Sequence, residues 1–353
     1  MNDSPRNAPT PPTPPTSSAV ARHAGVSRAT VSYVLNGQAA GRVSAATQAK
    51  VKQAAQDLGY VPHAAARSLR SGSSALVLIA VPADKVPAFG PLFAGFVARF
   101  QTALEEYGYT GVLHGARADR SPLDTARAWA ELRPAAVLTT FGAPLTEESV
   151  ALLHRSGTRA VLSLGPAPTP GAHGITIDQE EIGAVAAAHL LATGRRALGV
   201  VVPDERGLDS FSGPRLAGAR AAARAFPGAT VTPLPLAPTE ESAARARQAI
   251  SEGHVDGVFA YNDEYAMLLM RALQDAGVDI PGEVALVGAD DLLLARLLRP
   301  RLTSVRTELP APHEVAALVD RAITDPSFAP GVSYRTKAQV EPRDSTGDGA
   351  GPA

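Results

Sequence analysis

Cysteine is absent from the 353 residues of this chain. The sequence therefore cannot build a disulfide framework, a thiolate metal site or a thiol nucleophile. No stretch approaches the roughly 18 uninterrupted apolar residues that a membrane span requires, and the first residues lack the basic and then apolar layout of a signal peptide. We therefore expect a cytoplasmic protein with no membrane partner.

The motifs of common enzyme classes are absent too. The chain has no Gly-x-Gly-x-x-Gly fingerprint, no phosphate-loop motif, no Gly-x-Ser-x-Gly elbow and no His-Glu-x-x-His motif. The neighbouring carboxylates Asp290 and Asp291 would point to opposite faces of an extended backbone, which is poor geometry for a shared acid–base pair. The sequence therefore predicts no enzyme activity, no catalytic residue, no metal site and no cofactor.

The formal net charge of −1 is unevenly distributed along the chain. Residues 1–72 carry eight Lys or Arg against two Asp, a net charge of +6, whereas the other 281 residues carry 25 Lys or Arg against 32 Asp or Glu, a net charge of −7. A small basic segment on a larger acidic body indicates a polyanionic partner for the first part only. A solvated basic surface without a partner is the alternative.

Composition also divides the chain into segments. Residues 1–16 contain six prolines and, apart from Met1, no large apolar residue, which predicts a disordered tail. Residues 17–61 have the pattern of three short helices, and a hinge helix and linker are expected over 62–74. A second disordered tail is expected over 344–353.

The long segment 75–343 is predicted to be an α/β domain. Apolar runs such as 75–81 and 135–140 alternate with amphipathic segments such as 93–107. Strand–helix alternation of this kind is typical of parallel, doubly wound sheets. About 270 residues are more than a domain built on a single sheet usually contains, so we expect two similar α/β subdomains.

The segment 17–61 can be interpreted as a helix-turn-helix. A first helix is predicted to run to about His23, and Gly25 allows a tight break because glycine adopts a positive φ at little cost. Ser27 can cap a second helix that continues to about Leu35, and a third helix is predicted over about 47–58. Two helices joined by a Gly-containing turn are typical of a helix-turn-helix, although a generic three-helix bundle is the alternative.

The residues themselves resemble a known family. The segment 21–37, Ala-Arg-His-Ala-Gly-Val-Ser-Arg-Ala-Thr-Val-Ser-Tyr-Val-Leu-Asn-Gly, is similar to the DNA-binding signature of the lactose/galactose repressor family. The segment 60–70, Tyr-Val-Pro-His-Ala-Ala-Ala-Arg-Ser-Leu-Arg, resembles the hinge helix of that family. Two positions depart from the family pattern: Ala19 replaces the usual Asp just before the Val-Ala pair of the first helix, and His63 replaces the usual Asn after the hinge proline.

The resemblance implies that double-stranded DNA is the partner of the second helix. Ser27 and Thr30 would hold phosphates, while Arg28, Ala29 and Tyr33 would face base edges in the major groove. Ala29 offers only a methyl contact, for instance to thymine, and Arg28 can bind either guanine or a phosphate. Two further residues of this segment complete the expected DNA-binding set: Ser32 and Asn36.

The length and the side chains of the hinge segment indicate how it would act. Pro62 to Arg70 could form barely two helical turns, which are marginal in water unless something packs on them. By resemblance, Leu69 would wedge into the minor groove at the operator centre, and Arg67 and Arg70 suit phosphates. Packing of Leu69 in an ordinary core is the alternative. Paired hinge helices imply a homodimer and a near-palindromic DNA site. Assembly of two dimers into a tetramer is an alternative.

The body resembles the same family over residues 75–346. Matching blocks are Asp178-Gln-Glu-Glu-Ile-Gly183, Asp256-Gly-Val-Phe-Ala-Tyr-Asn-Asp263 and Val287-Gly-Ala-Asp-Asp291. The family shares the two-lobed fold of periplasmic sugar-binding proteins, in which a small molecule sits between the lobes at the ends of the strands. The resemblance implies a small polar effector, with a sugar as the default.

Matching positions also indicate which residues would hold the effector. The candidate effector-binding residues are Asp178, Arg215, Asn262, Asp290, Phe89 and Phe93. The alternatives are structural. Asp178 with Glu181 also reads as a helix capping box, Asn262 can cap the following helix, and Asp290 can brace a loop.

Together these patterns predict an α/β protein with an N-terminal three-helix DNA-binding domain, a hinge helix and a two-lobed effector domain with parallel sheets. The predicted function is a ligand-controlled, dimeric, sequence-specific transcription regulator, a repressor by expectation, associated with the bacterial nucleoid. The alternatives are a solute-binding receptor without DNA function, a constitutive DNA binder with a vestigial pocket, and a divergent enzyme on the same fold.

Overall fold

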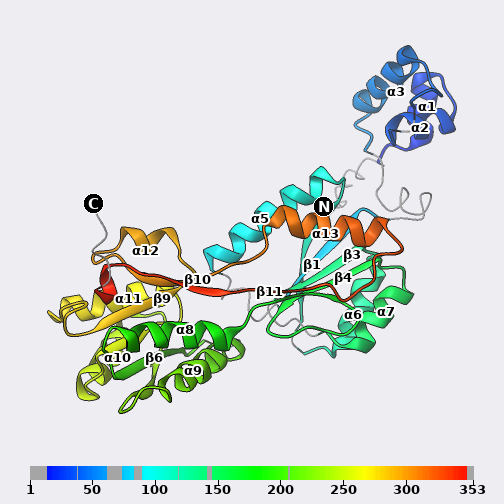
Figure 1. The fold of residues 1–353 in the computed structure, drawn as a ribbon. Coiled ribbons are helices and arrows are strands. Elements are labelled where there is room, and N and C mark those ends of the chain that lie inside the picture. Colours follow the sequence, from blue (N-terminus) through cyan, green and yellow to red (C-terminus); the bar gives the residue numbers. More distant parts are fainter. Residues whose placement is uncertain are drawn as a thin grey trace, which may run out of the picture. The chain divides into compact units, whose positions relative to one another are not determined.

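The computed structural model describes residues 14–37, 39–61, 74–82, 90–117, 119–140, 145–205 and 207–347. These residues belong to two compact units, Met1–Ser74 and Ala75–Ala353 (Figure 1). In the described parts of both units, every helix is too short or too polar to cross a membrane.

Three short helices make up the described part of the first unit: α1 (Ser17–Ala24), α2 (Arg28–Leu35) and α3 (Ala45–Asp57). Each begins where the sequence offers a hydroxyl cap, because Thr16, Ser27 and Ser44 each accept a hydrogen bond from the backbone N–H three residues on. Gly25 ends α1 with a φ of 67°. The helices enclose a core of small side chains: Val20, Ala21, Val31, Val34, Ala39, Val51, Ala54 and Ala55.

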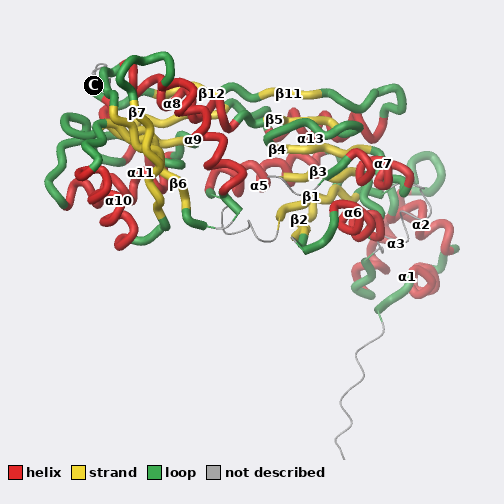
Figure 2. The backbone as a smooth tube through the Cα atoms, turned by 90° about the horizontal axis from the view of Figure 1, so that it is seen from below, coloured by secondary structure: helices red, strands yellow, loops and turns green. Residues whose placement is uncertain are grey.

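Two six-stranded sheets form the second unit, and Figure 2 shows them as two separate groups of strands. The first sheet contains β1 (Leu76–Pro82), β2 (Thr110–Ala116), β3 (Ala136–Thr140), β4 (Ala160–Gly165), β5 (His173–Thr176) and β11 (Ser333–Arg335). Its order is β11-β5-β4-β3-β1-β2, and all neighbours are parallel. This sheet and its helices are called the first lobe below.

The second sheet repeats the arrangement. It contains β6 (Ala197–Pro203), β7 (Thr230–Leu236), β8 (Gly257–Phe259), β9 (Ala285–Ala289), β10 (Thr303–Thr307) and β12 (Ala338–Glu341). Its order is β12-β10-β9-β8-β6-β7, parallel throughout except that β12 runs antiparallel to β10. The predicted pair of similar parallel-sheet subdomains is confirmed. This sheet and its helices are called the second lobe.

Helices cover both faces of each sheet (Figure 1). On the first lobe, α5 (Pro91–Glu106) and α13 (Pro312–Thr324) share one core cluster with the sheet, and α6 (Pro122–Glu131) and α7 (Glu147–Arg155) share the other. On the second lobe the two pairs are α8 (Gln179–Ala192) with α9 (Asp209–Ala223) and α10 (Glu240–Glu252) with α11 (Asp263–Asp275). Both faces of the central strands are therefore buried, which explains their continuous apolar runs.

The chain passes between the two lobes three times, at 177–178, 308–311 and 336–337. These crossings are tied together by backbone hydrogen bonds, from Glu308 N to Lys337 O at 3.0 Å and from Thr336 N to Thr176 O at 2.9 Å. Adjacent crossings of this kind are a common arrangement in proteins that close two lobes around a ligand by a hinge movement.

The end of the body differs from the prediction of a disordered tail beginning at residue 344. Asp344–Thr346 form the short 3-10 helix η2 after the last strand. The short helix α12 (Leu293–Leu297) lies earlier in the chain, between β9 and β10. Ser345 and Thr346 are buried, because Ser345 Oγ donates to Leu286 O at 2.6 Å and accepts from Thr303 N at 2.8 Å. The ordered body therefore continues past residue 343.

Candidate functional site

The first candidate site is the exposed face of α2. Arg28, Ala29, Tyr33 and Asn36 are exposed there, Thr30 and Ser32 are half-buried, and the intervening Val31 and Val34 point into the small core. The 3.6-residue repeat of the helix separates the two faces. A polar, exposed helix face of this size can enter the major groove of duplex DNA.

Hydrogen bonds fix the side chains at both ends of this face. Ser27 Oγ accepts from Thr30 N at 3.1 Å and lies 2.9 Å from Thr30 Oγ1, so the two hydroxyls expected to hold phosphates form a pair at the helix start. At the other end, Asn36 Nδ2 donates to Ser32 Oγ at 3.0 Å. The unpaired N–H groups and partial positive charge of a helix start favour an anion beside Ser27.

Arg42 adds a cation to the exposed face of α2, and the sequence did not predict it there. Its guanidinium carbon lies 5.3 Å from the centroid of the Tyr33 ring, within the range of a cation–π contact. Arg42 belongs to the loop before α3, and only the tertiary packing brings it to α2. No sequence pattern signalled this contact.

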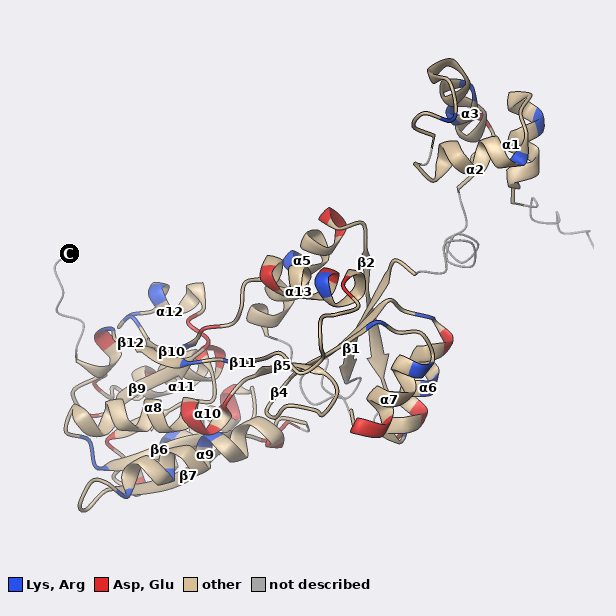
Figure 3. Cartoon of the chain, turned by 45° about the vertical axis from the view of Figure 1, so that its right-hand side comes forward, with Lys and Arg blue, Asp and Glu red and all other residues tan. Residues whose placement is uncertain are grey.

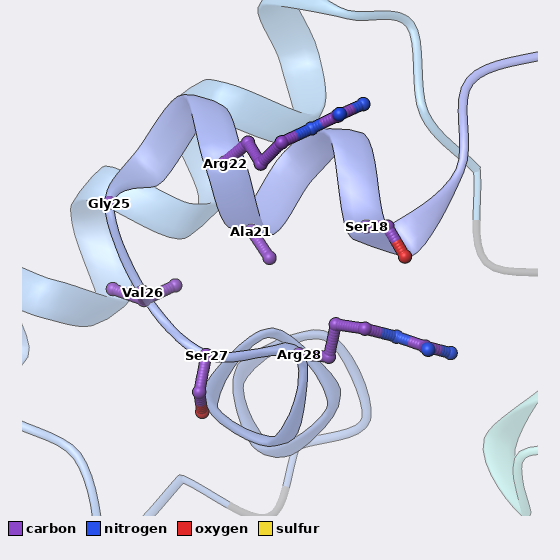
Figure 4. Close-up of a pocket in the computed structure, with 7 residues that line it drawn as sticks. All are labelled: Ser18, Ala21, Arg22, Gly25, Val26, Ser27 and Arg28. Atoms are coloured by element: carbon purple, nitrogen blue, oxygen red, sulfur yellow. The ribbon is translucent and has the colours of Figure 1, made fainter.

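A shallow concavity of about 540 Å3 lies between α1 and the start of α2. In Figure 4 the side chains of Arg22 and Arg28 extend in the same direction along it, with Ser18 beside them. Figure 3 shows further basic residues on this unit, whose only acidic residue among those described is Asp57. Two guanidinium groups beside a helix start provide a place for backbone phosphates.

Four of the candidate residues lie outside the described residues. They are Arg67, Leu69 and Arg70 of the hinge and Phe89 of the effector set.

The second candidate site is a cavity of about 100 Å3 with walls from both lobes of the body. It lies where both sheets place the carboxyl ends of their strands, the usual ligand position in doubly wound folds. Its lining residues are Gly90, Leu92, Phe93, Phe96, Leu164, Ile177, Gln179, Ile182, Leu208, Phe211, Arg215, Tyr261, Asn262, Asp290, Thr307 and Leu309. The structure thus brings Phe93, Arg215, Asn262 and Asp290 together from four separate elements.

Arg215 is held firmly in this cavity and is only 7% exposed. Its Nε donates to Gln179 Oε1 at 2.8 Å, its Nη1 donates to Tyr261 O, and its guanidinium carbon lies 4.6 Å from the centroid of the Tyr261 ring. A buried cation needs such partners, because desolvation of an unpaired charge is costly. Arg215 therefore sits in one defined orientation.

Glycines allow the helices that carry Arg215 and Gln179 to approach closely. A Cβ on Gly183 of α8 would lie 1.8 Å from the Arg215 carbonyl oxygen, and a Cβ on Gly218 of α9 would lie 1.9 Å from the Glu180 carbonyl oxygen. Only glycine fits at either crossing point. The contact of α8 with α9 thus determines where Arg215 reaches the cavity.

Asp290 follows β9 with a φ of 91°, and Asp291 has a φ of 46°, so the backbone there is not extended. Burial raises the pKa of Asp290, and the charge of Arg215 opposes this shift. Asp291 instead accepts from Arg343 Nη2 at 2.5 Å and from Arg296 Nη2 at 3.1 Å. The backbone thus differs from the extended form considered from the sequence, and the two arginine partners belong to Asp291.

Asn262 and Asp178 both cap helices, and only one of them lines the cavity. Asn262 Oδ1 accepts from Tyr265 N at 3.0 Å at the start of α11, and the residue also lines the cavity. Asp178 Oδ1 accepts from Glu181 N at 3.0 Å at the start of α8, while Oδ2 pairs with Arg335. Asp178 is not among the lining residues, so its contacts in this structure are those of a cap and of a lobe crossing.

A buried acid lies just behind the cavity wall. Asp263 is fully buried, and its carboxylate accepts from Ser304 Oγ at 2.6 Å and from Leu292 N at 2.7 Å. Burial raises the pKa of Asp263 to about 7, although these two hydrogen bonds act in the opposite direction. The group ties α11 to β10 and to the loop that carries Asp290.

The sequence did not predict several of the residues that line the cavity. Gln179 and Tyr261 lie inside blocks already singled out for resemblance, next to Asp178 and Asn262. Phe96 and Phe211 gave no signal, because apolar residues on amphipathic helices are normally assigned to the core. Leu309 lies in a lobe crossing and gave no signal either.

Comparison with known proteins shows which families the two units of the chain resemble. Residues 18–63 match the family model described as bacterial regulatory proteins, lacI family, and residues 187–346 match the periplasmic binding protein-like domain. The HTH-type transcriptional regulator GntR of Pseudomonas aeruginosa is 33% identical over 83% of this chain and 84% of its own length. The regulator CelR of Thermobifida fusca is 32% identical over 87% of this chain and 92% of its own.

Solved structures agree on the fold. A transcriptional regulator CelR–cellobiose complex superposes with a TM-score of 0.61 at 28% identity, over 94% of this chain and 99% of that one. A lac repressor dimer bound to operator and to the anti-inducer ONPF has a TM-score of 0.74 at 22% identity, over 95% of this chain and 99% of that one, and shows likeness of fold.

Proposed function

We propose, from the premise that this chain belongs to the lacI family of bacterial regulatory proteins and is a DNA-binding transcription regulator, that it is an effector-controlled repressor. The relatives are transcription regulators and not enzymes. The observation that carries the proposal is the combination of an exposed polar face on α2 with a separate two-lobed cavity. One chain thus contains a DNA reader and a ligand receptor.

On the DNA side, α2 would lie in the major groove. Arg28, Ala29 and Tyr33 would face base edges, while Ser27 and Thr30 would hold phosphates at the helix start. Arg22 and Arg42, which the structure adds to this surface, would strengthen phosphate binding without reading sequence. Because its partner is chromosomal DNA, the protein would work in the cytoplasm, at the nucleoid.

The hinge would connect DNA binding to the body. Leu69 would enter the minor groove at the centre of the operator, with Arg67 and Arg70 on the flanking phosphates. Two hinges are needed for one operator centre, so the unit of binding would be a homodimer on a near-palindromic site.

Exposed apolar side chains on the body support self-association. Val112 and Leu113 are exposed on β2, an edge strand, and Leu293 and Leu297 on α12 are 73% and 67% exposed. Paired apolar side chains on one short element are more typical of an interface than of open solvent. They are candidates for the homodimer contact.

On the effector side, the size of the cavity supports coupling between the sites. Ligand cavities usually measure about 300–1,000 Å3, whereas this one measures about 100 Å3. Binding a molecule of sugar size would therefore move the walls and shift the lobes about their three crossings. Such a movement would change the relation of the two hinges in a dimer, and a differential affinity of about 1–3 kcal/mol is enough for regulation. The cellobiose bound by the similar CelR structure supports a sugar as the default effector.

A gel-shift experiment tests the proposal. The full chain and a chain without residues 1–72 are each incubated with fragments of the genome in excess random competitor DNA at fixed salt. The full chain should retain specific fragments and the shortened chain should retain none, because the reader has been removed. Failure of the full chain to prefer any fragment would refute the repressor and leave a solute receptor.

The small cavity also favours one alternative, a constitutive DNA binder with a vestigial pocket. Calorimetry with a panel of metabolites separates the two. A repressor with an effector gives a binding heat for at least one compound and a matching change in operator affinity, whereas a constitutive binder gives a flat response.

A further inference from the structure

We propose that Arg343 is a positioning residue of the effector site, because its ion pair with Asp291 holds the turn after β9 in the conformation that places Asp290 at the cavity. Arg343 is not among the residues that line the cavity, so it would act only through its neighbour. The inference rests on the proposed function, since it requires that Asp290 meets the effector. It adds to that function a residue from the last segment of the body, between β12 and η2.

The position of the Asp290 carboxylate depends on its backbone. Asp290 lines the cavity, but its side chain makes no hydrogen bond or ion pair with another residue in the described part of the chain. Arg215 acts on it through its charge. A carboxylate without such partners lies where the backbone directs it, so the turn that carries Asp290 decides what the cavity presents to a ligand.

The backbone of this turn is unfavourable for the residues that occupy it. Asp290 has a φ of 91° and Asp291 has a φ of 46°, so two consecutive residues with a Cβ have a positive φ. Aspartate adopts such conformations more readily than most residues, but as a single residue. Arg133 and His254, the other described non-glycine residues with a positive φ, stand singly just after α6 and α10. A consecutive pair persists only when its surroundings determine the conformation.

Hydrogen bonds to the main chain fix part of the turn. Asp291 N donates to Ser304 Oγ at 3.0 Å, and Leu292 N donates to the buried Asp263 carboxylate at 2.7 Å. These bonds tie the backbone after Asp290 to β10 and to α11. The other anchor of the turn is the side chain of Asp291.

Two arginines bind the Asp291 carboxylate, and they differ in burial. Arg343 Nη2 donates to Oδ1 at 2.5 Å, and Arg296 Nη2 donates to Oδ2 at 3.1 Å. The Arg296 side chain is 61% exposed, whereas the side chains of Arg343 and Asp291 are 12% and 6% exposed. Water weakens an exposed ion pair, but a buried carboxylate has no substitute for a partner that is lost. Arg343 is therefore the arginine that holds Asp291.

Arg343 is itself fixed to the start of β10. Its backbone N donates to Thr303 Oγ1 at 2.8 Å, and its Nη1 donates to Leu302 O at 2.8 Å. The guanidinium thus connects β10 to the Asp291 carboxylate in one geometry. Without it, Asp291 would turn toward water, the pair of positive φ angles would lose its support, and Asp290 would leave its place at the cavity.

Carboxyl NMR of the full chain tests the positioning role without any ligand. The Asp290 signal, assigned by its absence in Asp290→Asn, is titrated with pH in the wild type and in Arg343→Ala. Loss of the positive charge alone would raise the pKa of Asp290, whereas movement of the carboxylate out of its buried position would lower it. We expect the pKa of Asp290 to fall. A rise or no change would overturn the positioning role.

A second variant and a matched control complete the titration. Arg343→Ala leaves the Asp291 carboxylate poorly paired and risks unfolding, so Arg343→Ala/Asp291→Asn removes both charges and should also lower the pKa of Asp290. Arg301→Ala removes the more exposed ion pair that the same last segment makes through Asp344, and should leave the Asp290 titration unchanged. An equal shift in Arg301→Ala, or failure of both Arg343 variants to fold, would make Arg343 a residue of the fold alone and overturn the inference.

Calorimetry with cellobiose, the ligand of the similar CelR structure, tests the consequence for binding. Loss of a residue that orients a ligand-binding group typically costs about tenfold or more in affinity, so we expect such a loss in Arg343→Ala and almost none in Arg301→Ala. Equal affinity of Arg343→Ala and the wild type would overturn the role in effector binding. If the wild type binds no cellobiose, the default sugar is wrong, and the carboxyl titration alone decides the role of Arg343. Failure of the gel-shift experiment would refute the proposed function and leave both of these results as they are.

Discussion

The three-helix unit and the two-lobed body place their functional side chains in opposite ways. In the three-helix unit they lie on one exposed face of α2 and its two caps, within the ten residues from Ser27 to Asn36, and the core beneath them is a handful of Val and Ala side chains. In the body they come from separate strands and helices and surround a small, largely buried cavity. The first site is a surface that a helix carries, whereas the second exists only when two lobes have folded.

This difference has energetic consequences. An exposed side chain on α2 can be replaced at little cost in stability, so its loss is felt almost entirely in DNA binding. A buried side chain in the cavity supports the fold as well, so its loss is felt in both. The variants below test that contrast.

The largest effect is expected for Gly183→Ala in the body. Its new Cβ would lie 1.8 Å from the Arg215 carbonyl oxygen, so α8 and α9 must separate. We expect the free energy of unfolding to fall by roughly 3–5 kcal/mol in urea titrations. Gly95→Ala on α5, where no atom lies within 4 Å of the new Cβ, should instead be neutral or stabilising. Equal effects at the two glycines would contradict the close helix contact.

Arg215→Ala should abolish the effector response without unfolding the chain. The loss of two charge-assisted hydrogen bonds, to Gln179 and to Tyr261 O, should lower the free energy of unfolding by about 2–3 kcal/mol. Effector-dependent release of operator DNA is the measurement. Arg271→Ala, which removes an exposed ion pair with Asp275, should cost under about 1 kcal/mol and leave the response intact. An unchanged ligand titration for Arg215→Ala would remove this residue from the site.

Leu69→Ala should weaken specific operator binding and leave effector binding unchanged. If the side chain is buried between base pairs, its loss should cost about 1.5–3 kcal/mol of binding free energy. Gel shifts at fixed salt measure operator affinity, and calorimetry measures effector affinity. A wedge role is ruled out if operator affinity stays at the wild-type value.

Asp263 should make the stability of the body depend on pH. Its pKa of about 7 lies above the ordinary value, so the folded state binds the extra proton and stability falls as pH rises. Between pH 6 and pH 8 this group alone should cost about 1.4 kcal/mol. Urea unfolding at three pH values should give a flatter profile for Asp263→Asn than for the wild type. Parallel profiles would mean that the carboxyl does not change its protonation state over this range.

The smallest effect is expected at two helix caps of the three-helix unit. Ser27→Ala and Ser44→Ala each remove the side chain that caps a helix, and each should cost about 1 kcal/mol of stability. Only Ser27 lies at the start of α2, so only Ser27→Ala should also weaken operator binding. Equal loss of binding in both variants would show that stability, and not the face of α2, limits DNA affinity.

Local patterns were enough to predict the three-helix unit. The hydroxyl cap at Ser27, the break at Gly25 and the 3.6-residue repeat of α2 act within a few residues of one another, and the structure has all of them. In the body, the apolar runs predicted the central strands because those strands are buried on both faces. The edge strands β2 and β7 carry exposed residues and gave a weaker signal.

Much of the cavity depended on tertiary structure. The partners of Arg215 are 36 and 46 residues away along the chain, the cap at Asp178 is completed by an arginine 157 residues on, and the apolar part of the lining consists of side chains that look like ordinary core. The amino-acid order alone settled the helices of the three-helix unit and the central strands of the body, since helix caps and apolar repeats within a segment are local. Which side chains meet across the two lobes was decided by three chain crossings and by one close helix contact, because distance in space is independent of distance along the chain.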